Sequence, residues 1–128
     1  MSDTVINEKN VLGSPLQACS YDPITGYLRD GCCATYGEGG VAHLVCVKVT
    51  AEFLEFSRSR GNDLSTAHPE MRFKGLKPGD RWCLHVLRWV EAWEAGKAPA
   101  VVLEATHANV LQFAPLSALK RYALDAKP

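Results

Sequence analysis

The sequence has no excess of either charge, because 14 Lys and Arg residues balance 14 Asp and Glu residues. A surface that follows nucleic-acid phosphates needs a basic excess or a basic patch. The densest basic grouping lies between residues 58 and 77, and Asp63 and Glu70 interrupt it. We therefore expect no nucleic-acid partner.

Long hydrophobic runs are absent as well. No segment approaches the roughly 20 consecutive apolar residues of a membrane-spanning helix. Residues 1–10 show no apolar stretch behind a basic segment, which is the pattern of a secretory signal. We therefore expect no membrane partner, and we predict a cytoplasmic location.

The cysteine content excludes complete pairing within the chain, since there are five cysteines. A reducing cytoplasm keeps thiols free, so the sequence predicts no structural disulfide framework. The thiols are then core residues, metal ligands or reactive groups.

What is present is the composition of one globular domain. The chain has 128 residues, of which 47% are hydrophobic and 22% are charged, and this length suits a single core. We predict a flexible N-terminus over residues 1–9, a globular domain over residues 10–124 and a flexible C-terminus over residues 125–128.

Hydrophobic periodicity predicts the elements of this domain. Turn-forming residues dominate residues 10–42, and Asp30 with Gly31 fits a tight hairpin turn. Strands are predicted over residues 43–49, 81–86, 100–106 and 110–113. Helices are predicted after Thr50, over residues 87–95 and from Pro115. The fold class is therefore α+β, with a mixed or antiparallel sheet of about four to five strands packed on one side by about three helices.

A thiol and imidazole set is the first candidate site. Zinc binds Cys and His side chains that converge from short segments, which makes Cys32, Cys33, Cys83 and His85 the predicted metal ligands. Cys83 and His85 share one face of a strand, about 7 Å apart along the backbone. Neighbours on an extended chain point in opposite directions, so one of Cys32 and Cys33 is expected to join a given site. The remaining candidates of this type are Cys19, Cys46, His43 and His107.

Other interpretations of these residues stay open. Cys32 or Cys33 could instead be a catalytic nucleophile or a redox thiol, whose reactivity needs a nearby cation or imidazole. Cys46 and Cys83 could be small buried hydrophobic residues within apolar strands. A third possibility is an interaction module without chemistry, which uses the loop over residues 61–80 or an exposed Trp surface.

Polar residues near the cysteines form a candidate ligand-binding set. We expect the turn before Cys33, the strand that carries Cys83 and the loop over residues 61–80 to meet at one polar site. The alternative is that the loop residues of this set only shape local turns. The predicted ligand-binding residues are Arg29, Asp30, Asn62, Asp63, Ser65 and Arg81.

Two strings carry a family resemblance. R-D-G-C-C at residues 29–33 and G-L-K-P-G-D-R-W-C at residues 75–83 closely resemble a family of small uncharacterised bacterial and plant proteins, a domain of unknown function. The resemblance covers about residues 10–124 and implies no established activity, substrate or cofactor. The family pattern reads C-L-C where this chain has Cys83, Leu84 and His85, and imidazole can replace thiolate on zinc but cannot form a disulfide. This departure favours metal ligation over a redox pair at His85.

Overall fold

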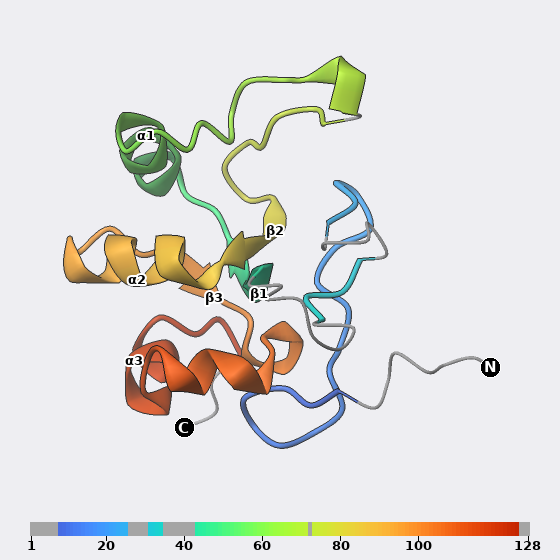
Figure 1. The fold of residues 1–128 in the computed structure, drawn as a ribbon, viewed down its shortest axis with the longest axis vertical. Helices are drawn as coiled ribbons and strands as arrows, with labels where there is room; N and C mark the ends of the chain where they lie inside the picture. Colours follow the sequence, from blue (N-terminus) through green and yellow to red (C-terminus); the bar gives the residue numbers. More distant parts are fainter. Residues whose placement is uncertain (1–7, 26–30, 35–42, 72, 126–128) are drawn as a thin grey trace.

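The computed structural model describes residues 8–25, 31–34, 43–71 and 73–125. Within these residues three strands form one sheet in the order β2-β1-β3, and both pairings are antiparallel (Figure 1). The strands are β1 (His43–Lys48), β2 (Arg81–His85) and β3 (Ala100–Val101). The α-helices are α1 (Ala51–Ser59), α2 (Val86–Glu94) and α3 (Leu116–Arg121). Short 3-10 helices are η2 (Pro69–Met71), η3 (Leu103–Ala105) and η4 (Ala108–Gln112).

The predicted α+β class is confirmed, and local signals explain the main elements. The hydroxyl of Thr50 caps α1 by accepting a hydrogen bond from the Phe53 backbone N–H at 3.0 Å. Gly61 follows α1 with a φ of 91°, a conformation that glycine adopts without steric cost. His85 ends β2 and caps α2, because its Nδ1 accepts from the Leu87 backbone N–H at 3.1 Å.

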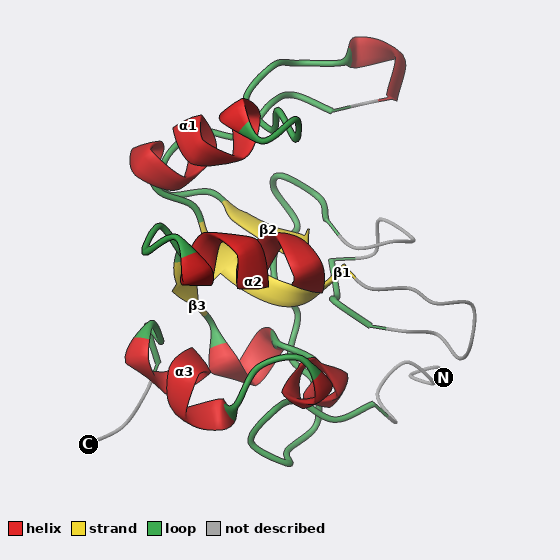
Figure 2. Cartoon of the chain, turned by 60° about the vertical axis from the view of Figure 1, so that its left-hand side comes forward, coloured by secondary structure: helices red, strands yellow, loops and turns green. Residues whose placement is uncertain are grey.

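The sheet is covered on both faces. On one face α2 lies across the strands, and α1 and α3 lie to either side of it (Figure 2). Trp89, Phe53 and Leu84 are buried in the main core with Val45 and Val47 of β1. A second, smaller core holds four cysteines with Val102 and Ala105. The helices thus pack on one side of the sheet, as predicted, and residues 8–25 and 31–34 lie over the second core on the other side.

The prediction of strands over residues 100–106 and 110–113 was wrong beyond Val101. The Asp125 carboxylate accepts the backbone N–H groups of Leu103 and Glu104 at 2.8 and 3.1 Å, which favours the turn η3. His107 then caps η4, because its Nδ1 accepts from the Asn109 N–H at 3.0 Å. Side chains thus replace strand partners here, and the sheet has three strands rather than four or five.

No helix among the described residues has both the length and the apolar character needed to cross a membrane.

Candidate functional site

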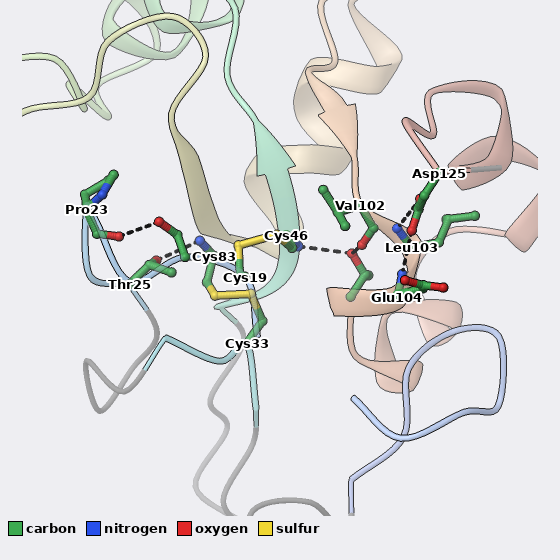
Figure 3. The surroundings of a disulfide bond; sticks show 12 residues. Cys19, Pro23, Thr25, Cys33, Cys46, Cys83, Val102, Leu103, Glu104 and Asp125 are labelled. Atoms are coloured by element: carbon green, nitrogen blue, oxygen red, sulfur yellow. Dashed lines mark hydrogen bonds between the residues drawn. A yellow bond between two sulfur atoms is a disulfide. The ribbon is translucent and has the colours of Figure 1, made fainter. Parts of the chain in front are cut away.

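Four cysteines from distant parts of the chain meet on the second face of the sheet (Figure 3). Cys46 of β1 and Cys83 of β2 lie directly opposite each other in the antiparallel register, so their side chains share a face. Cys19 and Cys33 come from the N-terminal segment that covers this face. All four are buried, with exposed fractions between 0% and 4%.

The four side chains form two disulfides. One joins Cys19 to Cys46, and the other joins Cys33 to Cys83, with Cα atoms 5.7 and 5.3 Å apart. The prediction of no structural disulfides was therefore wrong. It rested on the compartment and on an odd cysteine count, whereas pairing depends on which Cβ atoms the fold brings together.

The two disulfides lie against each other. The sulfur atoms of Cys19, Cys33 and Cys46 are all within 4.8 Å of one another, and Cys83 is bonded to the second of them. The two linkages also cross in sequence, because residue 33 lies between residues 19 and 46. Both connect the turn-rich segment to a strand, so they attach this segment to the sheet.

Hydroxyl groups complete the backbone hydrogen bonding around the cluster. The Cys83 N–H donates to Thr25 Oγ1 at 2.8 Å, and the Cys46 N–H donates to Thr106 Oγ1 at 3.1 Å. The Thr106 hydroxyl in turn donates to the Val102 carbonyl at 2.8 Å. Both threonines are fully buried, where water cannot hydrogen-bond the two strand N–H groups. The threonine hydroxyls therefore satisfy backbone donors that have no strand partner.

Gly31 lies beside the cysteine cluster at a position with no room for a side chain. Gly31 has a φ of 92°, and its carbonyl accepts the Cys19 N–H at 2.6 Å. A Cβ at this position would lie 2.6 Å from Cε1 of Tyr21. The position therefore favours glycine on both conformational and steric grounds. Its predicted partner in the turn, Asp30, lies outside the described residues.

A cavity of about 730 Å³ lies beside the cysteine cluster. It opens between the loop that follows α1, strand β2 and the first turns of α2. Its lining residues are Thr25, His43, Asn62, Leu64, Trp82, Cys83, Leu84, His85, Leu87, Arg88 and Glu91. Apolar surface and a few polar groups therefore meet in one concave site, which is typical of small-molecule sites.

Several polar side chains that line the cavity contact one another or nearby backbone. The rings of His43 and His85 meet edge to face with centroids 5.3 Å apart. The Arg88 guanidinium donates to Glu91 Oε1 and to the Arg60 carbonyl, each at 3.2 Å. Burial, and then the positive charge of Arg88, lower the pKa of His85 below its usual 6.5. Because Nδ1 of His85 accepts a hydrogen bond, the neutral ring carries its proton on Nε2.

The structure separates the members of the predicted metal set. Cys33 and Cys83 are bonded to each other, while Cys32 is half-buried and lies outside both disulfides. His85 lines the cavity and uses Nδ1 as a helix cap. Cys33 has no exposed surface, so a nucleophilic role for it would need an opening of the fold.

The predicted ligand-binding residues have different surroundings. Asn62 lines the cavity together with Cys83 and His85, so the start of the loop and strand β2 do meet. Arg81 is exposed at the start of β2, opposite Lys48 of β1. Arg29, like Asp30, falls outside the described residues.

Asp63 and Ser65 form hydrogen bonds with each other within the loop over residues 61–80. The Asp63 carboxylate accepts from the Ser65 N–H and hydroxyl at 3.0 and 2.9 Å, and from the Thr66 hydroxyl at 2.6 Å. These hydrogen bonds, the one from Thr66 first, lower the pKa of Asp63 to about 2. The carboxylate is thus engaged in shaping the turn.

Cys19 and Cys46 were only secondary candidates from the sequence, and Thr25, Arg88 and Glu91 were not predicted as site residues. Cys46 lies in an apolar strand and gave no sign of its partner, because its place opposite Cys83 follows only from the strand register. The sequence gives no indication of the role of Thr25, because its hydroxyl accepts a hydrogen bond from Cys83, which lies 58 residues away in the chain. The exposed Trp surface is also absent, since Trp89 is buried and Trp82 and Trp93 are half-buried.

Fold and site together define a small α+β domain with a buried four-cysteine cluster beside an open cavity. The chain belongs to the family described as an uncharacterized protein conserved in bacteria (DUF2237), which matches residues 9–123. No curated protein matches the sequence.

Proposed function

We propose that Cys19, Cys33, Cys46 and Cys83 form a redox-responsive metal centre. When oxidised, it holds the two disulfides; when reduced, it binds one zinc ion through four thiolates. The observation that carries this proposal is the convergence of the sulfur atoms. Three lie within 4.8 Å of one another, and the fourth is bonded to one of them.

The spacing of the sulfur atoms suits a tetrahedral ion. Zinc–sulfur bonds of about 2.3 Å place the four sulfur atoms of such a site roughly 3.8 Å apart. The sulfur atoms of Cys19, Cys33 and Cys46 are already within 4.8 Å of one another, and the Cys83 sulfur would move toward them once its bond to Cys33 is broken. The burial of all four side chains supports a closed structural site rather than one with an open coordination position.

This set replaces the one that the sequence suggested. Cys33 and Cys83 remain, while Cys19 and Cys46 take the places of Cys32 and His85. The exchange is supported by geometry, because Cys32 lies outside the cluster and His85 Nδ1 is occupied as a helix cap.

The two states differ by a balanced reaction. Two equivalents of a dithiol, or four of a monothiol, supply four electrons and four protons to convert the two disulfides into four thiols, and are themselves oxidised to two disulfides. Zinc then displaces the four thiol protons as it binds. In the cytoplasm, the compartment that the sequence predicts, the reduced zinc form prevails; small-molecule disulfides can accept the four electrons, re-form the two protein disulfides and release the ion.

Metal analysis and mass spectrometry test the proposal. We expect untagged protein, reduced and supplied with zinc, to contain one zinc per chain, and the oxidised metal-free protein to be lighter by four hydrogen atoms than the reduced one. Cobalt in place of zinc should give the absorption bands of a tetrahedral tetrathiolate site. Cys46→Ser should lose the tetrathiolate spectrum, whereas Cys32→Ser, outside the cluster, should keep it. Reduced protein that takes up neither ion would refute the metal centre.

A further inference from the structure

The cavity reaches only part of the four-cysteine centre. Of the four clustered cysteines, Cys83 alone is among the residues that line it. Cys33, its disulfide partner, has no exposed surface. Cys19 is 4% exposed but does not line the cavity. Cys83 is itself 2% exposed, so a small molecule in the cavity meets the centre at Cys83 and reaches its sulfur through a local opening of the cavity wall.

The identity of the attacked sulfur decides what is released. A thiolate that attacks the Cys83 sulfur forms a mixed disulfide there and expels Cys33 as a thiolate. The Cys33 sulfur lies within 4.8 Å of the sulfurs of both Cys19 and Cys46. The released thiolate can therefore attack the second disulfide, forming a new bond to one of its sulfurs and expelling the other. Attack on Cys33 would instead release Cys83, whose sulfur is not one of the three that lie within 4.8 Å of one another.

The cavity also carries groups that recognise charged ends of a small molecule. Arg88 is a cation, and the Nε2–H of neutral His85 is a donor, so both suit a carboxylate. Glu91 pairs with Arg88 at 3.2 Å and offers an anion for an ammonium group. Their side chains are about one-third exposed, at 36% for Arg88 and 34% for Glu91, so a ligand can reach both.

We infer that the cavity binds a small thiol of the amino-acid or peptide type, which reduces the centre by attacking Cys83 first. This inference rests on the proposed function and names its reductant and its order of bond exchange. A second thiol then attacks the mixed disulfide, which frees the Cys83 thiol and releases a small-molecule disulfide. Four small thiols are thus oxidised to two disulfides while the protein gains four thiols.

Trapping the first intermediate tests the route. Oxidised full-length protein is mixed with glutathione below one equivalent, quenched with acid and mapped by peptide mass spectrometry. The expected products are a glutathione adduct on Cys83 and a rearranged disulfide that joins Cys33 to Cys19 or to Cys46. An adduct on Cys19 or on Cys33 overturns the inference.

Rate measurements test the recognition. We compare the rates at which glutathione and uncharged 2-mercaptoethanol reduce the oxidised protein. Each rate is divided by the rate at which the same thiol reduces a small-molecule disulfide, which corrects for intrinsic thiol reactivity. Arg88→Gln should lower the glutathione rate about tenfold, the loss of one charge-assisted hydrogen bond, and leave the 2-mercaptoethanol rate unchanged. Arg58→Gln, an exposed change on α1 outside the cavity, is the matched control and should alter neither. Equal losses for both thiols contradict recognition at Arg88.

Different results would contradict the redox metal centre and the route of reduction through the cavity. An adduct on Cys19, in a protein that still binds one zinc per chain when reduced, contradicts the route through the cavity alone. Protein that forms no disulfide after oxidation contradicts the oxidised state of the centre, and the route with it.

Discussion

Removing the disulfide between Cys33 and Cys83 should cost several kcal/mol of stability. The bond spans a sequence separation of 50 residues, and the loop-closure entropy of such a crosslink is worth about 4 kcal/mol at 25 °C. The same expression gives about 3.5 kcal/mol for the 27-residue separation between Cys19 and Cys46. The two loops interleave, so the values do not add. For a chain of 128 residues, a loss of about 4 kcal/mol lowers the Tm by roughly 15 °C.

The assay compares four proteins by denaturant titration and calorimetry. They are the oxidised wild type, the reduced metal-free wild type, the double variant Cys33→Ala with Cys83→Ala, and the control Cys32→Ala. Alanine leaves no unsatisfied hydroxyl in the buried sites. We expect the double variant and the reduced metal-free protein to lose stability, the control to change little, and zinc to restore the reduced wild type. A reduced, metal-free protein within about 1 kcal/mol of the oxidised one would show that the crosslinks do not stabilise this fold.

Three further changes test the surroundings of the centre by denaturation. Thr25→Val removes the acceptor of the buried Cys83 N–H and should cost about 1 to 3 kcal/mol; an unchanged midpoint would contradict this. Gly31→Ala should cost about 1 to 2 kcal/mol because its φ is positive and the new Cβ meets Tyr21, and a neutral result would refute that strain. Burial lowers the pKa of His85 below 6.5, so the unfolded chain takes up the proton first. Stability should therefore fall as the pH drops from about 6.5, and His85→Asn, which keeps a capping acceptor, should reduce that slope.

The elements with strong periodicity could be predicted from the sequence. Strand β1 is a run of apolar and β-branched residues, and burial on both faces makes such a run continuous rather than alternating. The α1 boundaries follow from Thr50 and Gly61, whose roles depend only on nearby backbone. Local chemistry was sufficient in these cases because each signal and the group it acts on lie within a few residues.

The segment after β3 and the cysteine pairing depend on distant partners. Residues 103–105 turn because Asp125 caps them from about 20 residues away, and a propensity window contains no trace of that contact. The partner of Cys33 is Cys83, although Cys32 precedes it with the same chemistry. Only the register of β1 against β2, which places Cys46 opposite Cys83, makes the four-sulfur cluster apparent.

The composition of the second core explains why this face needs crosslinks. Among the described residues, its buried members other than the cysteines are Val102 and Ala105, and a buried valine contributes about 1.5 to 3 kcal/mol. Ordering the backbone of the covering segment costs about 1 to 2 kcal/mol per residue. Val11 packs in the main core, and Leu16 and Ala34 are buried, but the second core adds little apolar surface of its own. The disulfides stabilise residues 8–25 and 31–34 further by restricting the unfolded chain, and the proposed zinc form would do so by adding binding free energy. We therefore expect that loss of both disulfides, without bound zinc, weakens the attachment of residues 8–25 and 31–34 while the main core beneath α2 persists.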